Sequence, residues 1–260
     1  MKIEQTYYKI TNKAECHKGY QYVDGLNILD KAFEPVGTCV AGGLYFTTAK
    51  HIFNYLHCGC NLREITLPKD CQWVQDPQRD KFRADRIILG KKYDLADPLT
   101  FQLLLEEGAD IHALNDRALC WASRKGHLDV VKYLVEKGAD IHANNDYALG
   151  PPVSKETIGG LRENLLKQIS RGHASRKGHL DIVQYLLEID TNNQANADMA
   201  LNIASEHGHS EIVKHMVEVG ADIHSKDDHA LRWASRKNHP KVVKYLVEKE
   251  PIFMRIIILH

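Results

Sequence analysis

The sequence predicts a chain of two parts. A small α+β N-terminal domain is expected over residues 1–92, followed over residues 93–250 by an all-α solenoid with shortened 30-residue repeats. A segment that begins at Gly108 recurs in register at Gly138 and Gly220, and such self-similarity is typical of repeat architectures. Before Tyr93 no such period exists, and short runs of β-branched and aromatic residues, which favour strands, dominate instead.

Each repeat is expected to form two short helices and a turn. The first helix covers about Ala118–Lys125 and the second about Leu128–Lys137, because a glycine, which commonly terminates helices, follows each of them. The second helix carries an apolar face at helical spacing, formed by Leu128, Val131, Leu134 and Val135. One such helix pair cannot bury its apolar face alone, so neighbouring units are expected to stack.

The spacing of the repeats is regular except at one place. Gly108 and Gly138 are 30 residues apart, and Asp190, which stands where the next glycine is expected, lies 30 residues before Gly220. From Gly138 to Asp190 there are 52 residues, so 22 have been added, and the insertion is placed at residues 150–173. We interpret it as a tolerated loop or a decayed duplication; the alternative is a binding element that projects from the concave side.

The segment after the last repeat is apolar. Residues 251–260 read Pro-Ile-Phe-Met-Arg-Ile-Ile-Ile-Leu-His. Because solenoids need their ends covered, this C-terminal tail is expected to fold over the last helix pair as a cap; the alternative is a self-association segment.

The recurring residues resemble the ankyrin repeat. The resemblance rests on the sequence Ala122–Leu128, the pair Val130-Val131 and the turn Gly138–Ile141, and it covers roughly residues 93–250. It implies about four repeats, preceded by a half-repeat at Asp94–Glu107. The usual unit has about 33 residues, and the missing residues fall in the β-turn before the first helix. Shorter hairpin tips are therefore expected.

The N-terminal domain is expected to contain one helix and several short strands. Thr48 is expected to cap a helix of about Ala49–Leu56. The expected strands are Thr6–Ile10, Tyr20–Val23, Gly43–Thr47, Leu62–Leu67, Cys71–Gln75 and Arg86–Leu89. The domain resembles the one that precedes ankyrin repeats in giant-virus (Mimivirus-type) proteins, through Tyr8–Lys13, Gly19–Asn27, Gly42–Thr47, Arg63–Thr66 and Ala84–Leu89. This resemblance implies an architecture and no reaction.

Charge and composition exclude several classes of partner. The 34 basic and 34 acidic residues balance, which argues against a nucleic-acid binder that relies on phosphate contacts. No apolar run approaches the about 20 residues of a membrane helix, and the first residues do not form a signal peptide. Six unevenly spaced cysteines do not suggest a disulfide scaffold. We expect an intracellular protein of a reduced compartment, the host cytoplasm if viral, and not a secreted one.

Enzymatic and metal chemistry find little support in the sequence. His57, Cys58, Cys60 and Cys71 form a low-probability zinc set, because Cys58 and Cys60 are one residue apart and lack the spacing of a usual zinc pair. The strand Gly43–Thr47 and Glu64 faintly resemble ADP-ribosyltransferase-like folds, but no upstream His-Gly pair accompanies them. No phosphate-binding loop or nucleophile elbow is present. We therefore predict a protein that is not an enzyme, with no cofactor and no small-molecule substrate.

A binding surface remains as the predicted function. Ankyrin proteins bind partners through the hairpin tips and the groove-facing residues of the first helices. In this sequence those helix positions carry paired cations in three units, at Arg124, Lys125, Arg176, Lys177, Arg236 and Lys237. Trp121 and Trp233 occupy matching positions beside them and are the predicted aromatic anchors. The secondary candidates are the tips Asn115, Asp116, Arg117, Asn145, Asp146, Tyr147, Asp227, Asp228 and His229.

The hypothesis is a non-enzymatic scaffold that binds an acidic protein segment in this groove. One alternative is an adaptor that recruits substrates to a host ubiquitin ligase through residues 1–92, and another is a decaying paralogue without a partner. The recurring histidines, such as His179, His209 and His239, are predicted to be structural, because one such residue per unit suits hydrogen bonding in the loops.

Overall fold

The computed structural model of the chain describes residues 6–17, 19–37, 40–76, 80–141, 143, 169–189 and 193–249. The chain divides into two compact units. Unit 1 consists of Met1–Trp121 and Lys132–Ala139, and unit 2 of Ala122–Val131 and Asp140–His260. The expected tail and residues 150–168 of the expected insertion lie outside the described residues.

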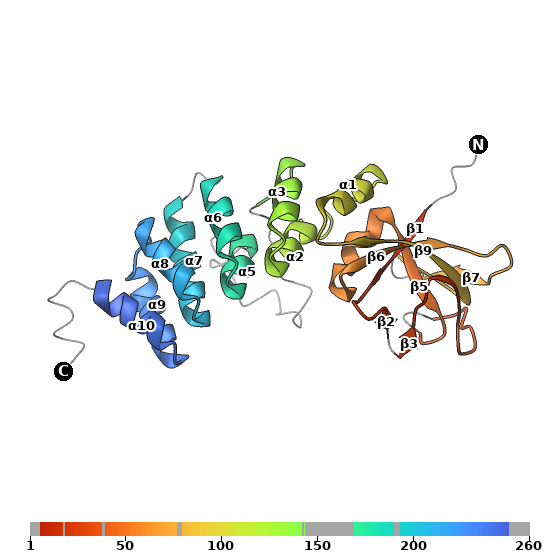
Figure 1. The fold of residues 1–260 in the computed structure, drawn as a ribbon, viewed down its shortest axis with the longest axis horizontal. Helices are drawn as coiled ribbons and strands as arrows, with labels where there is room; N and C mark the ends of the chain where they lie inside the picture. The colour runs from red at the N-terminus through yellow and green to blue at the C-terminus, as the bar shows by residue number, and fades with distance from the viewer. Residues whose placement is uncertain are drawn as a thin grey trace, which may run out of the picture. The chain divides into compact units, whose positions relative to one another are not determined.

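Unit 1 is built on a seven-stranded sheet (Figure 1), in which every described pairing is antiparallel. Its strands, in spatial order, are β4 (Gly25–Ile28), β9 (Arg86–Asp94), β6 (Asn61–Thr66), β1 (Tyr7–Thr11), β5 (Leu44–Thr48), β8 (Phe82–Ala84) and β7 (Trp73–Gln75). A separate hairpin pairs β2 (Cys16–His17) with β3 (Tyr20–Gln21). Each expected strand overlaps an observed one, whereas β2, β4 and β8 were not predicted.

Successive side chains of each strand point to opposite faces of this sheet, and the two faces have different neighbours. One face holds a cluster that includes Tyr22, Leu44, Phe46 and Ile87. On β1, Tyr7 belongs to this face and its ring lies 5.1 Å from that of Phe46. Tyr8 points to the opposite face, because successive side chains of a strand alternate.

The expected helix at Ala49–Leu56 is present and begins at the expected residue, but the expected cap by Thr48 was wrong. It is a 3-10 helix, η1 (Ala49–Cys58), and the Thr48 side chain makes no capping hydrogen bond. Thr48 is the last residue of β5 and keeps an extended backbone, so the helix leaves the strand directly. At its other end, a Cβ on Gly59 would lie 1.9 Å from the carbonyl oxygen of Thr11, so only glycine fits there.

The first helix after the sheet packs within unit 1. β9 continues to Asp94, two residues past the expected domain boundary, and α1 (Pro98–Glu106) follows. Asp97 caps α1 by accepting a hydrogen bond of 3.0 Å from the backbone N–H of Leu99. Phe101 of α1 stacks on Phe53 of η1, with ring centroids 5.7 Å apart. The half-repeat expected at Asp94–Glu107 is thus a helix that covers η1.

The remaining helices come in pairs, as the repeat predicts. They are α2 (Arg117–Lys125), α3 (Leu128–Glu136), α5 (Ile169–Lys177), α6 (Leu180–Glu188), α7 (Asn193–His207), α8 (Ser210–Glu218), α9 (Ser225–Arg236) and α10 (Pro240–Lys249). In unit 2, α7 lies between α5 and α9, and α8 contacts both α6 and α10 (Figure 1). Helices α6, α8 and α10 begin 30 residues apart. Residues 169–173, expected to end the insertion, belong to α5.

The apolar face of the second helices differs slightly from the expected one. In α3 the fully buried residues are Val130, Val131 and Leu134, whereas Leu128 and Val135 are half-buried. The same three positions are buried in α6 as Ile182, Val183 and Leu186. None of the helices in the described ranges is both long and apolar enough to cross a lipid bilayer.

Candidate functional site

The predicted basic residues lie at the ends of the first helices of unit 2. Arg176 and Lys177 end α5, and Arg236 and Lys237 stand at the end of α9; these four are exposed, as is Lys125 of α2, whereas Arg124 is half-buried. We call the six residues Arg124, Lys125, Arg176, Lys177, Arg236 and Lys237 the basic column. The repeat that lies between α5 and α9 carries Glu206 and His207 at the matching positions of α7.

A histidine from each following repeat contacts the backbone beneath this column. His179 Nε2 lies 3.2 Å from the carbonyl oxygen of Arg124, and His209 Nε2 lies 2.8 Å from that of Arg176. His239 Nε2 lies 2.9 Å from the carbonyl oxygen of Glu206. Because a carbonyl can only accept, each Nε2 carries the proton. The prediction that these three histidines are structural is confirmed. Their contacts join each repeat to the one before it.

The glycine that ends each first helix makes room for the same histidine. Gly178 and Gly208 have φ of +81° and +78°, a left-handed backbone that favours glycine. A Cβ on Gly178 would lie 2.7 Å from His209 Nδ1, and one on Gly208 would lie 2.6 Å from His239 Nδ1. In the last described repeat, Asn238 takes this position with φ of +59°.

The two tryptophans have different environments despite their matching positions. Trp233 is half-buried, and its ring centroid lies 5.0 Å from Arg236 Cζ and 5.8 Å from Lys237 Nζ, within reach of a cation–π interaction. Trp121 is only 3% exposed and packs beside Phe101, with ring centroids 6.1 Å apart. The prediction of Trp121 as an anchor is therefore wrong, because its indole is in the core of unit 1.

The predicted tips form left-handed turns. Leu114, Asn115 and Asp116 have φ between 52° and 54°, and Lys226, Asp227 and Asp228 have φ between 55° and 57°. In each turn a histidine is bonded to the aspartate four residues later: His112 Nδ1 lies 3.0 Å from Asp116 Oδ1, and His224 Nδ1 lies 2.6 Å from Asp228 Oδ1.

The predicted tip residues differ in how accessible they are to a partner. Asp116 is 4% exposed, so its prediction as a partner contact is wrong. Asn115 and Asp227 are exposed, and Arg117, Asp228 and His229 are half-buried. Burial lowers the pKa of His229, whose ring lies 5.7 Å from that of Trp233. The tips Asn145, Asp146 and Tyr147 lie outside the described residues.

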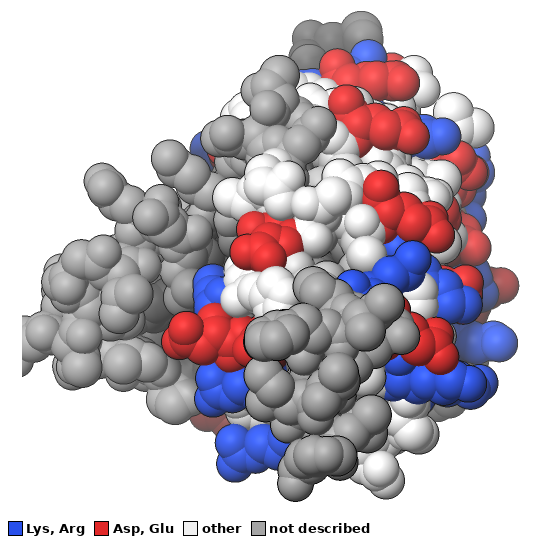
Figure 2. All heavy atoms as spheres, turned by 90° about the vertical axis from the view of Figure 1, so that its left-hand side faces the viewer, with Lys and Arg blue, Asp and Glu red and all other residues white. Residues whose placement is uncertain are grey.

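Charges of opposite sign are unevenly distributed over the face that carries α9 and α10. In Figure 2 the acidic side chains are most frequent in the upper half of the view and the basic ones in the lower half and along its right edge. The overall neutrality of the chain therefore does not describe this face, over which the two signs are unevenly distributed.

The residues considered for zinc do not come together. In the described part of the chain, no three His, Cys, Asp or Glu side chains are placed to hold a metal ion. Cys58 Sγ lies 3.6 Å from His57 Nε2, but Cys60 contacts Asn61 instead. Burial raises the pKa of both the Cys58 and the Cys71 thiol, which disfavours the thiolate that zinc needs.

Glu64, the residue considered for ADP-ribosyl transfer, is engaged by a tyrosine. The Tyr93 hydroxyl donates a hydrogen bond to its carboxylate. Burial, together with this bond, raises the pKa of Tyr93 to about 12. Glu64 is thus held on the sheet by its neighbour on β9, an arrangement that serves the fold.

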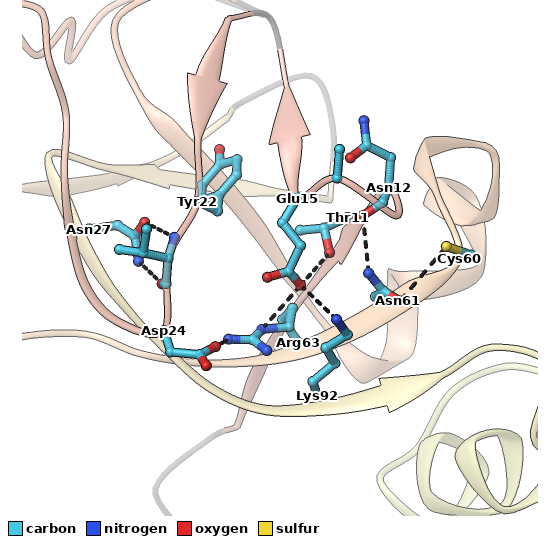
Figure 3. A network of polar contacts seen from close by, with 12 residues as sticks. Thr11, Asn12, Glu15, Tyr22, Asp24, Asn27, Cys60, Asn61, Arg63 and Lys92 are labelled. Carbon is cyan, nitrogen blue, oxygen red and sulfur yellow. Dashed lines mark hydrogen bonds and ion pairs between the residues drawn. The ribbon is translucent and has the colours of Figure 1, made fainter.

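A polar network on the same sheet is centred on Arg63, which is 2% exposed. Figure 3 shows its guanidinium between the carboxylates of Asp24 and Glu15. Lys92 Nζ lies 3.9 Å from Glu15 Oε1, and Thr11 donates a hydrogen bond of 3.2 Å to that oxygen. Two cations thus meet two carboxylates. The network fastens the segment that carries β2 and β3 to strands β6 and β9, and we interpret it as structural.

Comparison with known proteins gives the family of the repeat half. The family model for ankyrin repeats in three copies matches residues 95–145 and 172–255, just over half of the chain. Ankyrin repeats are a protein-interaction module, and stacked repeats of this kind offer an extended binding surface. The gap between the matched segments, 146–171, overlaps the insertion expected at residues 150–173.

Three relatives are proteins of one giant virus. An ankyrin repeat protein of Acanthamoeba polyphaga mimivirus is 47% identical over 133 residues, which are 49% of this chain and 65% of the relative. An uncharacterised protein of the same virus is 46% identical over 129 residues, 48% of this chain and 94% of that protein. A third, also an ankyrin repeat protein, is 42% identical over 131 residues, 49% of this chain but only 40% of its own length. The chain thus spans less than two thirds of these two ankyrin relatives. On the match of the family model, the chain belongs to the ankyrin-repeat family.

Proposed function

We propose that unit 2 binds an acidic segment of a protein partner along the basic column, and that the chain acts as a non-enzymatic interaction module. The observation that carries the proposal is the coincidence of exposed cations with the histidine contacts. The carbonyls of Arg124 and Arg176 accept hydrogen bonds from the following repeat, so the side chains at these positions recur once per repeat on one side of the unit.

Trp233 adds an anchor at one end of the column. Its ring is half-buried and lies beside Arg236 and Lys237. The exposed part of the indole can therefore pack against a bound segment. Tryptophan and arginine are over-represented among residues that dominate binding energies. Five of the six cations of the column are exposed, so their field favours the approach of negative charge and is screened by salt. Asp227 and His229 of the adjacent turn are secondary contacts.

The interruption at Glu206 and His207 gives the site a pattern. A partner segment is expected to place its acidic residues opposite Arg176–Lys177 and Arg236–Lys237, and a neutral or basic residue between them. Relatives of viral origin suggest that the partner is a viral or host protein.

A peptide library displayed on phage and selected against the full chain tests the proposal. We expect the enriched peptides to be acidic and to lose most of their binding at 0.5 M salt. In a variant with Arg176, Lys177, Arg236 and Lys237 all replaced by Glu, binding should fall at least tenfold. The matched control replaces Lys214, Lys241, Lys244 and Lys249, on the second helices α8 and α10, by Glu and should retain binding. Enrichment of neutral or basic peptides, or equal loss in both variants, would contradict the basic column as the site.

A further inference from the structure

The N-terminal domain contains a pocket of about 450 Å³, within the range of pockets that hold small molecules. It opens among β1, β5, η1 and the segment that carries β2 and β3. Its walls are largely apolar and aromatic, formed among others by Leu29, Leu44, Phe46, Tyr20, Tyr22 and Tyr45. All of these residues belong to unit 1, so the pocket is complete within one compact unit.

One lysine in this pocket lacks a counter-charge. Lys9 of β1 lines the pocket and is only 8% exposed. Its ammonium donates a hydrogen bond of 2.8 Å to the carbonyl oxygen of Tyr45 and lies 4.5 Å from the centroid of the Tyr22 ring. Neither contact supplies a negative charge, and in the described part of the chain Lys9 forms no ion pair. An ammonium has three donors, so this group can accept a further partner.

The other buried cations of the domain differ from Lys9 in this respect. Arg63 is paired with Asp24 and Glu15. Lys81 and Arg83 both approach the fully buried carboxylate of Asp76, at 3.6 Å and 3.8 Å. Each of these three cations thus has a carboxylate within 4 Å, and Lys9 has none among the described residues. Because a buried charge is costly unless it is paired, this difference favours a ligand for Lys9.

We propose that this pocket binds a small organic carboxylate with a flat apolar or aromatic body. The carboxylate would pair with the Lys9 ammonium, and the body would lie among the tyrosine rings, Leu44 and Phe46. The match follows from two complementary needs: the buried Lys9 ammonium, which has no carboxylate partner among the described residues, calls for a negative charge, and apolar walls call for an apolar surface to exclude water.

A phosphate group fits the pocket less well than a carboxylate. Phosphate sites commonly use arginine forks or the N-terminus of a helix, because a phosphate carries up to two charges and needs several donors. No arginine is among the described residues that line this pocket. Of the other two lysines that line it, Lys81 is already engaged by Asp76 and Lys31 is exposed to solvent. This proposal goes beyond the protein-binding function of unit 2 and departs from the expectation of a chain without a small-molecule ligand.

Calorimetric titration of the full chain with four probes tests the proposal: phenylacetate, phenyl phosphate, benzyl alcohol and acetate. We expect measurable binding of phenylacetate, with at least tenfold weaker binding of each of the other three. Lys9→Met and Lys9→Gln should each weaken phenylacetate binding at least tenfold. The glutamine variant keeps a side-chain hydrogen-bond donor without the charge, so it serves as a second test if the methionine variant does not fold. Lys50→Met, which removes an exposed lysine of η1, should bind as the parent chain does.

Three results would overturn the proposal. They are the absence of phenylacetate binding, unchanged phenylacetate affinity in a folded Lys9→Met or Lys9→Gln chain, and preferential binding of phenyl phosphate or benzyl alcohol. Circular dichroism of each variant establishes that the chain is folded before its affinity is compared.

Discussion

The imidazole of His209 donates a hydrogen bond of 2.8 Å to the carbonyl oxygen of Arg176 and so joins two neighbouring repeats. We expect His209→Ala to lower the free energy of unfolding by about 1–2 kcal/mol, because the bond is lost and the carbonyl at the end of α5 loses a partner. Urea denaturation followed by circular dichroism measures this effect.

His215 provides the control for this substitution. It lies on α8 in the same repeat and is half-buried, but among the described residues its ring makes no contact of the His209 kind. His215→Ala should cost less than half as much as His209→Ala. Equal losses would show that the contact between repeats does not contribute specifically to stability.

The close approach of His239 to Gly208 predicts a large effect of a single methyl group. We expect Gly208→Ala to destabilise the chain by at least about 2 kcal/mol, because the Cβ would meet His239 Nδ1 at 2.6 Å and the backbone at φ +78° disfavours alanine. Gly220 is the matched control: its φ is +94°, but a Cβ there meets nothing within 4 Å. Gly220→Ala should therefore cost only about 1 kcal/mol.

A double variant separates the steric effect from the backbone effect at Gly208. Adding His239→Ala removes the atom that the new Cβ would meet. The second substitution should then cost less in the Gly208→Ala chain than in the parent chain, by an interaction energy of about 1 kcal/mol. Strict additivity of the two free-energy changes would argue against the contact.

The repeat half shows what periodicity can and cannot predict. The ends of α2 and α3 lie within one residue of the expected ones, because glycine terminates both helices. Burial could not be predicted in the same way. Trp121 and Trp233 occupy one repeat position, yet Trp121 is buried beside Phe101 and Trp233 is half-buried. A repeat unit specifies its own helices, whereas burial depends on which neighbours a unit has.

The N-terminal half could be predicted less well because its sheet is covered on both faces. β1 reads Tyr-Tyr-Lys-Ile-Thr, and a lysine inside a strand normally indicates the solvent face. In the structure, Tyr8 is buried on one face and Lys9 on the other, beside Tyr22. The pocket is assembled from residues far apart in sequence, so no local pattern could predict it.

The left-handed turn before α9 predicts a stabilising substitution. Lys226 is exposed and has φ of +55° and ψ of +51°, a conformation that costs a residue with a side chain about 1 kcal/mol. We expect Lys226→Gly to raise the free energy of unfolding by about 0.5–1 kcal/mol, after the loss of backbone entropy that glycine brings. Lys226→Ala, which keeps a Cβ, should not do so. A glycine variant that is less stable than the parent chain would contradict the left-handed turn.

Lys9 predicts a dependence of stability on pH. Burial lowers its pKa from 10.5 to about 8. Between these two values the unfolded chain keeps the proton that the folded chain has released, so stability gains from rising pH in this window. Below pH 8 both states are protonated, and the full cost of burying an unpaired charge is present. At pH 7 without ligand, Lys9→Met should therefore be more stable than the parent chain by about 1–3 kcal/mol.

The difference in stability between Lys9→Met and the parent chain should stay constant from pH 6 to 7.5 and shrink as the pH rises toward 9.5. Burial raises the pKa of Tyr8 and Tyr22, but both variants contain these tyrosines, so their effect cancels in the difference. Urea unfolding of the two chains at a series of pH values measures this difference.

Substitution of a structural residue would lower the stability of the chain. Lys9→Met is instead expected to raise stability and to lose phenylacetate binding. A Lys9→Met chain less stable than the parent at pH 7 would mean that Lys9 serves the fold rather than a ligand.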